Sequence, residues 1–361
     1  MRPRAWRRRS LLPLFLATLY GLAIVYASLQ PFVNWMAPVP GAPYFLFAPW
    51  PPRWVRYDLV INVSAYLPFG FFVGLIPRWR GPSRQLVWGI GTGALLSLAM
   101  ESLQMFLPTR DANIADLIFN TTGSAIGALL AVAFARSPKA GVALASARER
   151  WFLPGAAGDI GLALLAIWLA VQANPAIPLF AAMYDSAARP AAEPATADVA
   201  ATIVESAQSA FQLLGVGLFV ALLMRERRHV TGAVLLLIGA AAIIKGVAAT
   251  MLLSPAAGEH WVTPGVALGV AAGLILLALA IQLPRSVQVT LATIALLSSL
   301  LTTVFAPDLV FARAPLGLFN GPYGHLLNFN GLTHTVLLFW PAAASTFLFV
   351  LAGRPDWGEQ G

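Results

Sequence analysis

The chain has 361 residues, of which 58% are hydrophobic, and its mean hydropathy is +0.75. This composition excludes an ordinary soluble domain, and the absence of cysteine excludes disulfides, haem thiolates and zinc–thiolate sites. The formal net charge of +8 would suit nucleic-acid binding in a soluble protein, so the positions of the basic residues decide what the charge means.

Apolar segments recur along the whole chain, and each is about long enough to cross a hydrocarbon core of roughly 30 Å. They lack the alternating pattern of a β-barrel, and backbone groups in lipid must be satisfied internally, so helices are predicted. We expect an all-α, polytopic integral membrane bundle with about ten transmembrane helices, at 11–29, 58–77, 85–107, 114–135, 157–173, 203–224, 230–253, 263–283, 286–306 and 333–352.

Basic residues gather in alternate connections between these segments, beginning with the N-terminal arm. Because cytoplasmic loops carry the excess of Lys and Arg, both termini are predicted to be cytoplasmic. The basic surplus then reports topology, and no nucleic-acid partner is expected. In an alternative interpretation, Arg7–Arg9, the apolar run and Val25–Ala27 form a cleaved signal peptide, which leaves the later helices in the same orientation.

The order of these segments predicts three parts: a four-helix membrane domain at 10–136, a basic cytoplasmic linker at 137–156, and a six-helix membrane extension of unknown function at 157–352. The first outer connection, residues 31–57, is unusual because seven prolines alternate there with aromatic residues. Such a segment suggests a cap at the membrane interface, and an ordinary aromatic belt explains it equally well.

Polar residues are concentrated in three successive helices of the first part. Each helix carries an acid and an amide about one turn apart, at a similar depth, and the turn between the last two helices adds an arginine and an aspartate. Polar groups at this depth are costly unless they are paired or functional. We therefore predict a cavity open to the exterior, lined by Asp58, Asn62, Glu101, Gln104, Arg110, Asp111, Asp116 and Asn120.

Helix capping is the alternative for three of these acids, because Asp58, Asp111 and Asp116 lie near predicted helix N-termini. Glu101 lies near a helix C-terminus instead and needs a partner, which could be Arg110, a proton or a cation held by carboxylates. The chain has no P-loop, no Rossmann fingerprint, no GxSxG and no HExxH. We therefore expect no cofactor and no resident metal.

Small residues follow on the third of these helices, where Gly123 and Gly127 are four residues apart and predict close helix packing. The whole pattern from Asp58 to Gly127, with Pro68–Gly70 between its first two parts, resembles the VanZ-like membrane domain over about residues 10–136. That family takes its name from a protein of glycopeptide-resistance clusters that gives low-level teicoplanin resistance. The resemblance implies that the eight polar residues are the family's polar core, and that the protein lies in a bacterial cytoplasmic (inner) membrane.

The second half of the chain has polar residues of its own. Glu205 and Gln208 share a face of one predicted helix, and Lys245 lies at a comparable depth on the next helix. These three form a predicted secondary polar site, in which a Glu205–Lys245 ion pair is plausible. Irregular outer loops are predicted at 174–202 and, with an Asn-Gly turn, at 319–334.

Three functions fit these observations. The first is an outward-facing membrane protein that binds or moves a cell-envelope molecule, such as a polyprenyl-linked intermediate, in contact with membrane lipids. This function would connect the chain with antibiotic resistance or envelope polysaccharide metabolism. The second is an intramembrane enzyme on a lipid-linked substrate, with Glu101 as general base; enzymatic activity is not the favoured interpretation. The third is a structural or assembly subunit whose protein partners are unknown.

Overall fold

The computed structural model describes residues 10–30, 32–50, 56–77, 81–175, 177, 179–180, 195–253, 261–305 and 324–354. Within these ranges only the backbone is described at 56–58, 138–142, 145, 195–198, 200–201, 299–305 and 324–328. The regular elements of the described chain are all helices, apart from one isolated antiparallel bridge between Phe152 and Met224. The predicted all-α class is confirmed for this part of the chain.

Six described helices are long and apolar enough to cross a membrane: Leu12–Leu29, Pro82–Gln104, Ile114–Arg136, Thr202–Leu223, Arg227–Leu252 and Phe329–Ala352. Four shorter apolar helices cover Leu59–Gly74, Gly155–Val171, Pro264–Ala280 and Arg285–Ser298. Each predicted segment coincides with one of these helices. The count of ten spans and the side on which the termini lie stay predictions.

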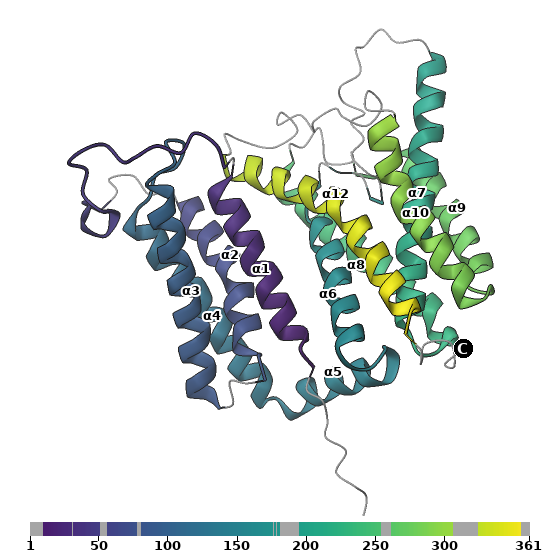
Figure 1. The fold of residues 1–361 in the computed structure, drawn as a ribbon, viewed down its shortest axis with the longest axis horizontal. Helices are drawn as coiled ribbons and strands as arrows, with labels where there is room; N and C mark the ends of the chain where they lie inside the picture. Colours follow the sequence, from purple (N-terminus) through teal and green to yellow (C-terminus); the bar gives the residue numbers. More distant parts are fainter. Residues whose placement is uncertain are drawn as a thin grey trace, which may run out of the picture. The chain divides into compact units, whose positions relative to one another are not determined.

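The chain divides into two compact units. The first comprises Met1–Glu149 and Pro154–Ala163, and the second comprises Arg150–Leu153 and Leu164–Gly361. In the first unit α2 and α4 make the most extensive contact, α3 packs against both, and α1 packs against α2 and α3 (Figure 1). These helices are α1 (Leu12–Leu29), α2 (Arg56–Gly74), α3 (Pro82–Gln104) and α4 (Ile114–Arg136), followed by α5 (Pro138–Trp151) and the beginning of α6 (Gly155–Val171).

Small residues on α4 bring its backbone against that of α2. A Cβ atom on Gly123 would clash with the backbone of Val63, and one on Gly127 would clash with the backbone at Leu67 and Phe71. The predicted packing role of the two glycines is confirmed. Because such close approach needs small side chains on one helix, the sequence pattern identified the surface correctly.

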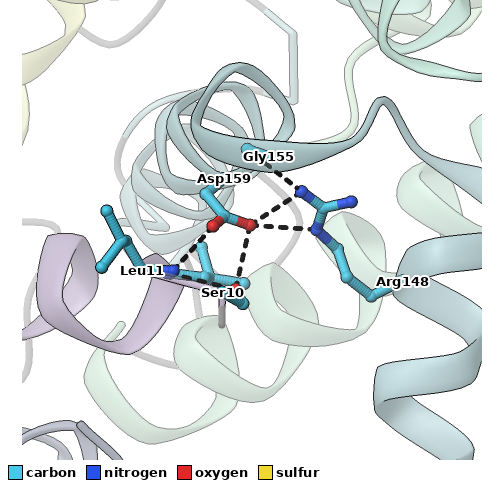
Figure 2. Close-up of polar contacts among 6 residues, drawn as sticks. Ser10, Leu11, Arg148, Gly155 and Asp159 are labelled. Carbon is cyan, nitrogen blue, oxygen red and sulfur yellow. Dashed lines mark hydrogen bonds and ion pairs between the residues drawn. The ribbon is translucent and has the colours of Figure 1, made fainter. Parts of the chain in front are cut away.

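Asp159 ties the beginning of α1 to the α5–α6 turn (Figure 2). Its Oδ2 accepts the Leu11 backbone N–H at 2.7 Å, and its Oδ1 accepts the Ser10 hydroxyl at 2.9 Å. Arg148 donates to Oδ1 from Nε at 3.0 Å and from Nη2 at 2.8 Å, and also donates to the Gly155 carbonyl. A carboxylate is favoured at a helix N-terminus, so Asp159 stabilises the first turn of α1 from a distant part of the sequence.

The second unit is organised around α7 (Ala195–Leu223), in which Leu218 and Phe219 are completely buried. Three glycines of α9 (Pro264–Ala280) lie directly against α7, because a Cβ atom on any of them would clash with α7 atoms. Around these two helices, α10 (Arg285–Phe305) contacts both α7 and α12 (Gly324–Ala352), and α8 (Val230–Leu252) contacts α7.

Two helices of this unit begin earlier than predicted. α7 begins at Ala195, so its first turns replace the end of the loop predicted at 174–202. The alanine-rich sequence there has high helix propensity, which the loop prediction underestimated. α12 begins at Gly324, so the loop with an Asn-Gly turn at 319–334 is wrong from that residue onward. Asn174 donates to Asn330 Oδ1 at 2.8 Å, and this tertiary hydrogen bond satisfies the residue within the helix.

Candidate functional site

Four of the eight predicted residues meet between α2, α3 and α4: Asn62, Glu101, Asp116 and Asn120. α2 and α4 run parallel and α3 runs antiparallel to them, so the end of α3 lies beside the beginnings of the other two helices. Asp58 lies one turn before Asn62 on α2, and its side chain is outside the described residues. Asp111 lies in the α3–α4 turn and is exposed.

Glu101 is 3% exposed and lies in the last turn of α3, where the helix dipole disfavours a negative charge. Its Oε2 accepts the backbone N–H of Asn113 at 3.0 Å, and Asn113 is the N-cap residue of α4. The carboxyl group of Glu101 therefore faces the positive end of α4. Its Oε1 accepts no hydrogen bond from another described residue.

Asn113 connects the acids of the site to each other. Its side-chain Oδ1 accepts the backbone N–H of Asp116 at 3.0 Å, which caps α4, and its Nδ2 donates to Asp116 Oδ2 at 2.9 Å and to the Asp111 carbonyl at 3.1 Å. Asn62 donates to the other carboxylate oxygen of Asp116 at 2.6 Å. These bonds fix the orientation of Asp116. The N-cap residue of α4 is Asn113, which the capping alternative did not name, and Asp116 lies in the first turn of the helix.

A second layer of polar groups lies one turn deeper. Asn120 donates to Ser97 Oγ at 3.0 Å, and the buried Tyr66 hydroxyl lies close to Ser97. Asn120 is 5% exposed and Ser124 is completely buried, and neither Asn120 Oδ1 nor Ser124 Oγ has a hydrogen-bond partner among the described residues. Buried acceptors of this kind are rare without a water or ligand, so this layer can accept hydrogen bonds from a bound group.

These polar groups form one buried cluster, which ends at Ser124 and which we call the polar pocket: Asn62, Tyr66, Ser97, Glu101, Asp116, Asn120 and Ser124. There Gly70 of α2 and Gly93 of α3 both lie so close that a Cβ atom would clash with Ser124. Beyond it, Gly89 lies against Ala128 in the same way. Ser124 is near the middle of α4, and residues 125–135 of that helix carry no polar side chain, so the pocket occupies one half of α4.

Arg110 and Gln104 lie at the end of α1. Arg110 donates from Nη2 to the carbonyls of Ala27 and Gln30, each at 3.0 Å, and Gln104 donates to the Ser28 carbonyl at 3.0 Å. The last carbonyls of a helix have no intrahelical partner, and α1 has no basic residue in its last turn, so these two side chains supply the missing donors. The expected Glu101–Arg110 ion pair is absent among the described residues, because the guanidinium points to α1.

The electrostatic environment of the pocket is mainly acidic. Asp116 and Asp111 lie close enough to Glu101 to repel a negative charge on it, whereas Arg110 attracts one. Partial burial lowers the pKa of the Arg110 guanidinium, and the carboxyl group of Glu101 raises it. Since the pKa of arginine lies so far above neutrality, Arg110 keeps its charge and is the fixed cation near the pocket among the described side chains.

Sequence reasoning missed two members of the site. Asn113 directly precedes a long apolar helix and is followed three residues later by Asp116, which is a recognisable N-cap pattern. Tyr66 is one turn after Asn62 and continues the polar face of α2, but an aromatic residue in an apolar helix gives no strong signal.

The secondary polar residues do not form the expected ion pair. Lys245 is completely buried and donates to the carbonyls of Asn174 and Ile177, at 2.8 and 2.7 Å. These carbonyls follow the end of α6, so the lysine satisfies backbone groups in a buried non-helical segment. Glu205 and Gln208 are buried on α7, and the Glu205 carboxylate lies against Gly265 in the first turn of α9. That position favours a negative charge.

Among the described residues no group of three or more His, Asp or Glu side chains is arranged to hold a metal ion. A comparison with family models matches residues 7–135 to the VanZ/LLP1 family. No curated protein and no solved structure matches the chain. The matched residues cover α1 to α3 and all of α4 except its last residue. They therefore include the polar pocket between α2, α3 and α4, and Arg110 with the carbonyls at the end of α1 to which it donates. The N-terminal part of the chain, residues 7–135, is therefore a VanZ/LLP1-like domain, and the chain carries apolar helices long enough to cross a membrane.

Proposed function

We propose that the polar pocket of the VanZ-like domain binds the head of an amphipathic, lipid-linked cell-envelope molecule, such as a polyprenyl-linked intermediate. The observation that carries this proposal is the buried Asn120, whose Oδ1 has no partner among the described residues, one turn below the free Oε1 of Glu101. Two acceptors at successive depths, of which Asn120 Oδ1 is fully buried, suit a ligand head that carries hydroxyl or N–H donors.

The surroundings of the pocket suit the apolar tail of such a molecule. Large apolar side chains on the outer faces of α3 and α4 are exposed, including Leu95 at 66% and Leu129 at 56%. In a bilayer these faces meet acyl chains, so a lipid tail can stay in the membrane while the polar head enters between the helices. Because the pocket closes at Ser124, binding from one membrane face fits this geometry better than passage through the α2–α4 interface.

The proposal also includes the orientation of the protein in the membrane and its biological role. With both termini in the cytoplasm of a bacterial cell, the pocket opens on the outer side of the cytoplasmic membrane, where envelope intermediates are assembled. Holding such an intermediate would connect the protein with glycopeptide (teicoplanin) resistance or with envelope polysaccharide metabolism. The family match and the apolar helices support this context.

Native mass spectrometry of the detergent-purified protein tests the proposal. Wild type should retain a lipid adduct of defined mass, and Asn120→Leu and Glu101→Gln should reduce its occupancy at least tenfold. Glu149→Gln, at an exposed position on α5, is the control and should retain the adduct as wild type does. Equal adducts in all four proteins, or none in any of them when each is folded, would contradict lipid binding in the pocket.

A role in helix assembly is the second candidate, and one observation favours it. Asn62, Asn113 and Asp116 are already hydrogen-bonded to each other across two helices and the α3–α4 turn. If the network only fixes helix packing, Asn62→Leu should destabilise the first unit without changing any bound lipid. A stable Asn62→Leu protein that has lost its lipid would exclude this role.

A further inference from the structure

The connection between α1 and α2 exposes an apolar surface that carries no charge. Residues 32–50 contain no Asp, Glu, Lys, Arg or His. Large hydrophobic side chains are widely exposed along this segment: Phe47 81%, Val39 76%, Met36 62%, Val33 54%, Trp50 48% and Trp35 44%. So many exposed apolar groups in 19 residues mark an interaction surface, because scattered single residues are the normal pattern on a soluble face.

This loop, residues 32–50, is fixed to the ends of two helices that can cross the membrane. The Phe32 N–H donates to the Leu29 carbonyl of α1 at 3.0 Å, and the Met36 N–H donates to the Phe106 carbonyl just after α3 at 2.9 Å. The Tyr44 hydroxyl lies 2.6 Å from Ser102 Oγ on α3. The loop is therefore held at the ends of these two helices, which is the level of the lipid headgroups when the helices span a bilayer.

The backbone of the loop also suits this level. Non-helical backbone is costly in a dehydrated environment because its N–H groups need partners. Four residues of the loop are prolines, which have no N–H: Pro38, Pro40, Pro43 and Pro49. Three further N–H groups are satisfied within tight turns: Ala42 donates to the Val39 carbonyl, Phe47 to that of Tyr44 and Ala48 to that of Phe45. Fewer free donors lower the cost of placing this segment against lipid.

One side chain distinguishes the anchored side of the loop from its free side. Phe45 is 2% exposed, whereas Phe47, two residues later in the same short 3-10 turn, is 81% exposed. The loop is thus attached to the protein through Phe45 and Tyr44 and presents Phe47 outward. Aromatic side chains at the interface of a bilayer are favoured because they combine a large apolar area with tolerance of the polar headgroups.

We propose that residues 32–50 insert into the lipid bilayer and rest at the boundary between headgroups and acyl chains, on the membrane face where the α3–α4 turn lies. The partner is the phospholipid bilayer itself. The bond between Tyr44 and Ser102, which follows Glu101 in α3, places the inserted loop at the same end of α3 as the polar pocket. Inserted apolar side chains then form a lipid-facing surface at this end of the helix. Insertion of the loop does not depend on which molecule the pocket binds.

The native chain has no cysteine, so single nitroxide labels can report membrane depth at chosen positions. The variants are Val39→Cys and Phe47→Cys in the loop, with Glu149→Cys on an exposed part of α5 as the aqueous control. Each labelled full-length protein is reconstituted at low protein-to-lipid ratio in vesicles of phosphatidylethanolamine and phosphatidylglycerol. Collision rates of the label with oxygen and with a water-soluble nickel chelate are then compared.

Insertion predicts that both loop labels collide with oxygen several-fold more, relative to the nickel chelate, than the Glu149→Cys label does. Collision ratios equal to the aqueous control would overturn the proposal. A second copy or another part of the chain could also shield the labels, and then collisions with both reagents would fall together. That result too would overturn lipid insertion, and doping the sample with unlabelled protein would show whether a second copy is the cause.

Discussion

Replacement of Asp159 by alanine should destabilise the first unit by about 3 kcal/mol. The carboxylate accepts hydrogen bonds from Ser10, Leu11 and Arg148 and is 2% exposed. Loss of an N-cap costs about 0.5–2 kcal/mol. Removing one partner of a buried ion pair costs about 3–5 kcal/mol. Because the Arg148 side chain is 11% exposed and keeps its hydrogen bond to the Gly155 carbonyl, we expect the lower end of this range.

Unfolding of the purified protein in detergent, followed by heat or by denaturant, measures this effect. Asp159→Ala should unfold well below wild type, and Asp159→Asn should lie between them, because the amide keeps an acceptor for the Leu11 N–H and loses the charge. Glu149→Ala is the matched control, since this acid is exposed and close in sequence. If Asp159→Ala and Glu149→Ala unfold alike, the stabilising role of this cluster is refuted.

Further predictions concern packing, capping and the buried lysine, and the same unfolding assay checks each of them. Gly127→Ala should lower the free energy of unfolding by about 1–3 kcal/mol, because its Cβ would clash with α2. Gly91→Ala has open space around it and should leave the free energy of unfolding unchanged or raise it by up to about 1 kcal/mol. Equal effects of the two substitutions would contradict the close approach of α4 to α2. Asn113→Ala should lower the free energy of unfolding by about 0.5–2 kcal/mol because α4 loses its N-cap, and Asn113→Ser should recover part of this stability. An alanine variant as stable as wild type would show that the cap is unimportant. Lys245→Met should destabilise the second unit by about 1–3 kcal/mol because two buried carbonyls lose their donor; a stability equal to wild type would contradict that role.

Much of the polar pocket was predictable from spacing alone. Glu101 and Asn120 are polar residues in apolar helices at the same predicted depth, and helix periodicity places them on facing surfaces. The roles of Arg110 and Lys245 were not predictable in this way. Both were expected to pair with carboxylates, and both instead donate to backbone carbonyls, Arg110 at the end of α1 and Lys245 in the non-helical segment after α6. The sequence does not mark these carbonyls as unsatisfied.

Helix positions were also predictable where hydropathy changes sharply, as at the ends of α4. The prediction failed where polar or small residues continue a helix. α7 extends back to Ala195 through residues of mixed polarity, and α12 includes the Asn330–Gly331 pair that normally favours a turn. In the second case the hydrogen bond from Asn174 outweighs local propensity, and such long-range bonds cannot be read from a single sequence.

We infer that the polar pocket opens at one membrane face and closes at Ser124. Thiol accessibility tests it directly, because the native chain has no cysteine. Asn62→Cys lies beside Asp116 in the pocket, and Ala131→Cys lies in the closed half, where Ala131 is completely buried. In oriented vesicles a water-soluble maleimide should label Asn62→Cys from the face that carries the α3–α4 turn and should label Ala131→Cys from neither face. Labelling of Ala131→Cys from the opposite face would reveal a continuous polar path and contradict a pocket with a closed end.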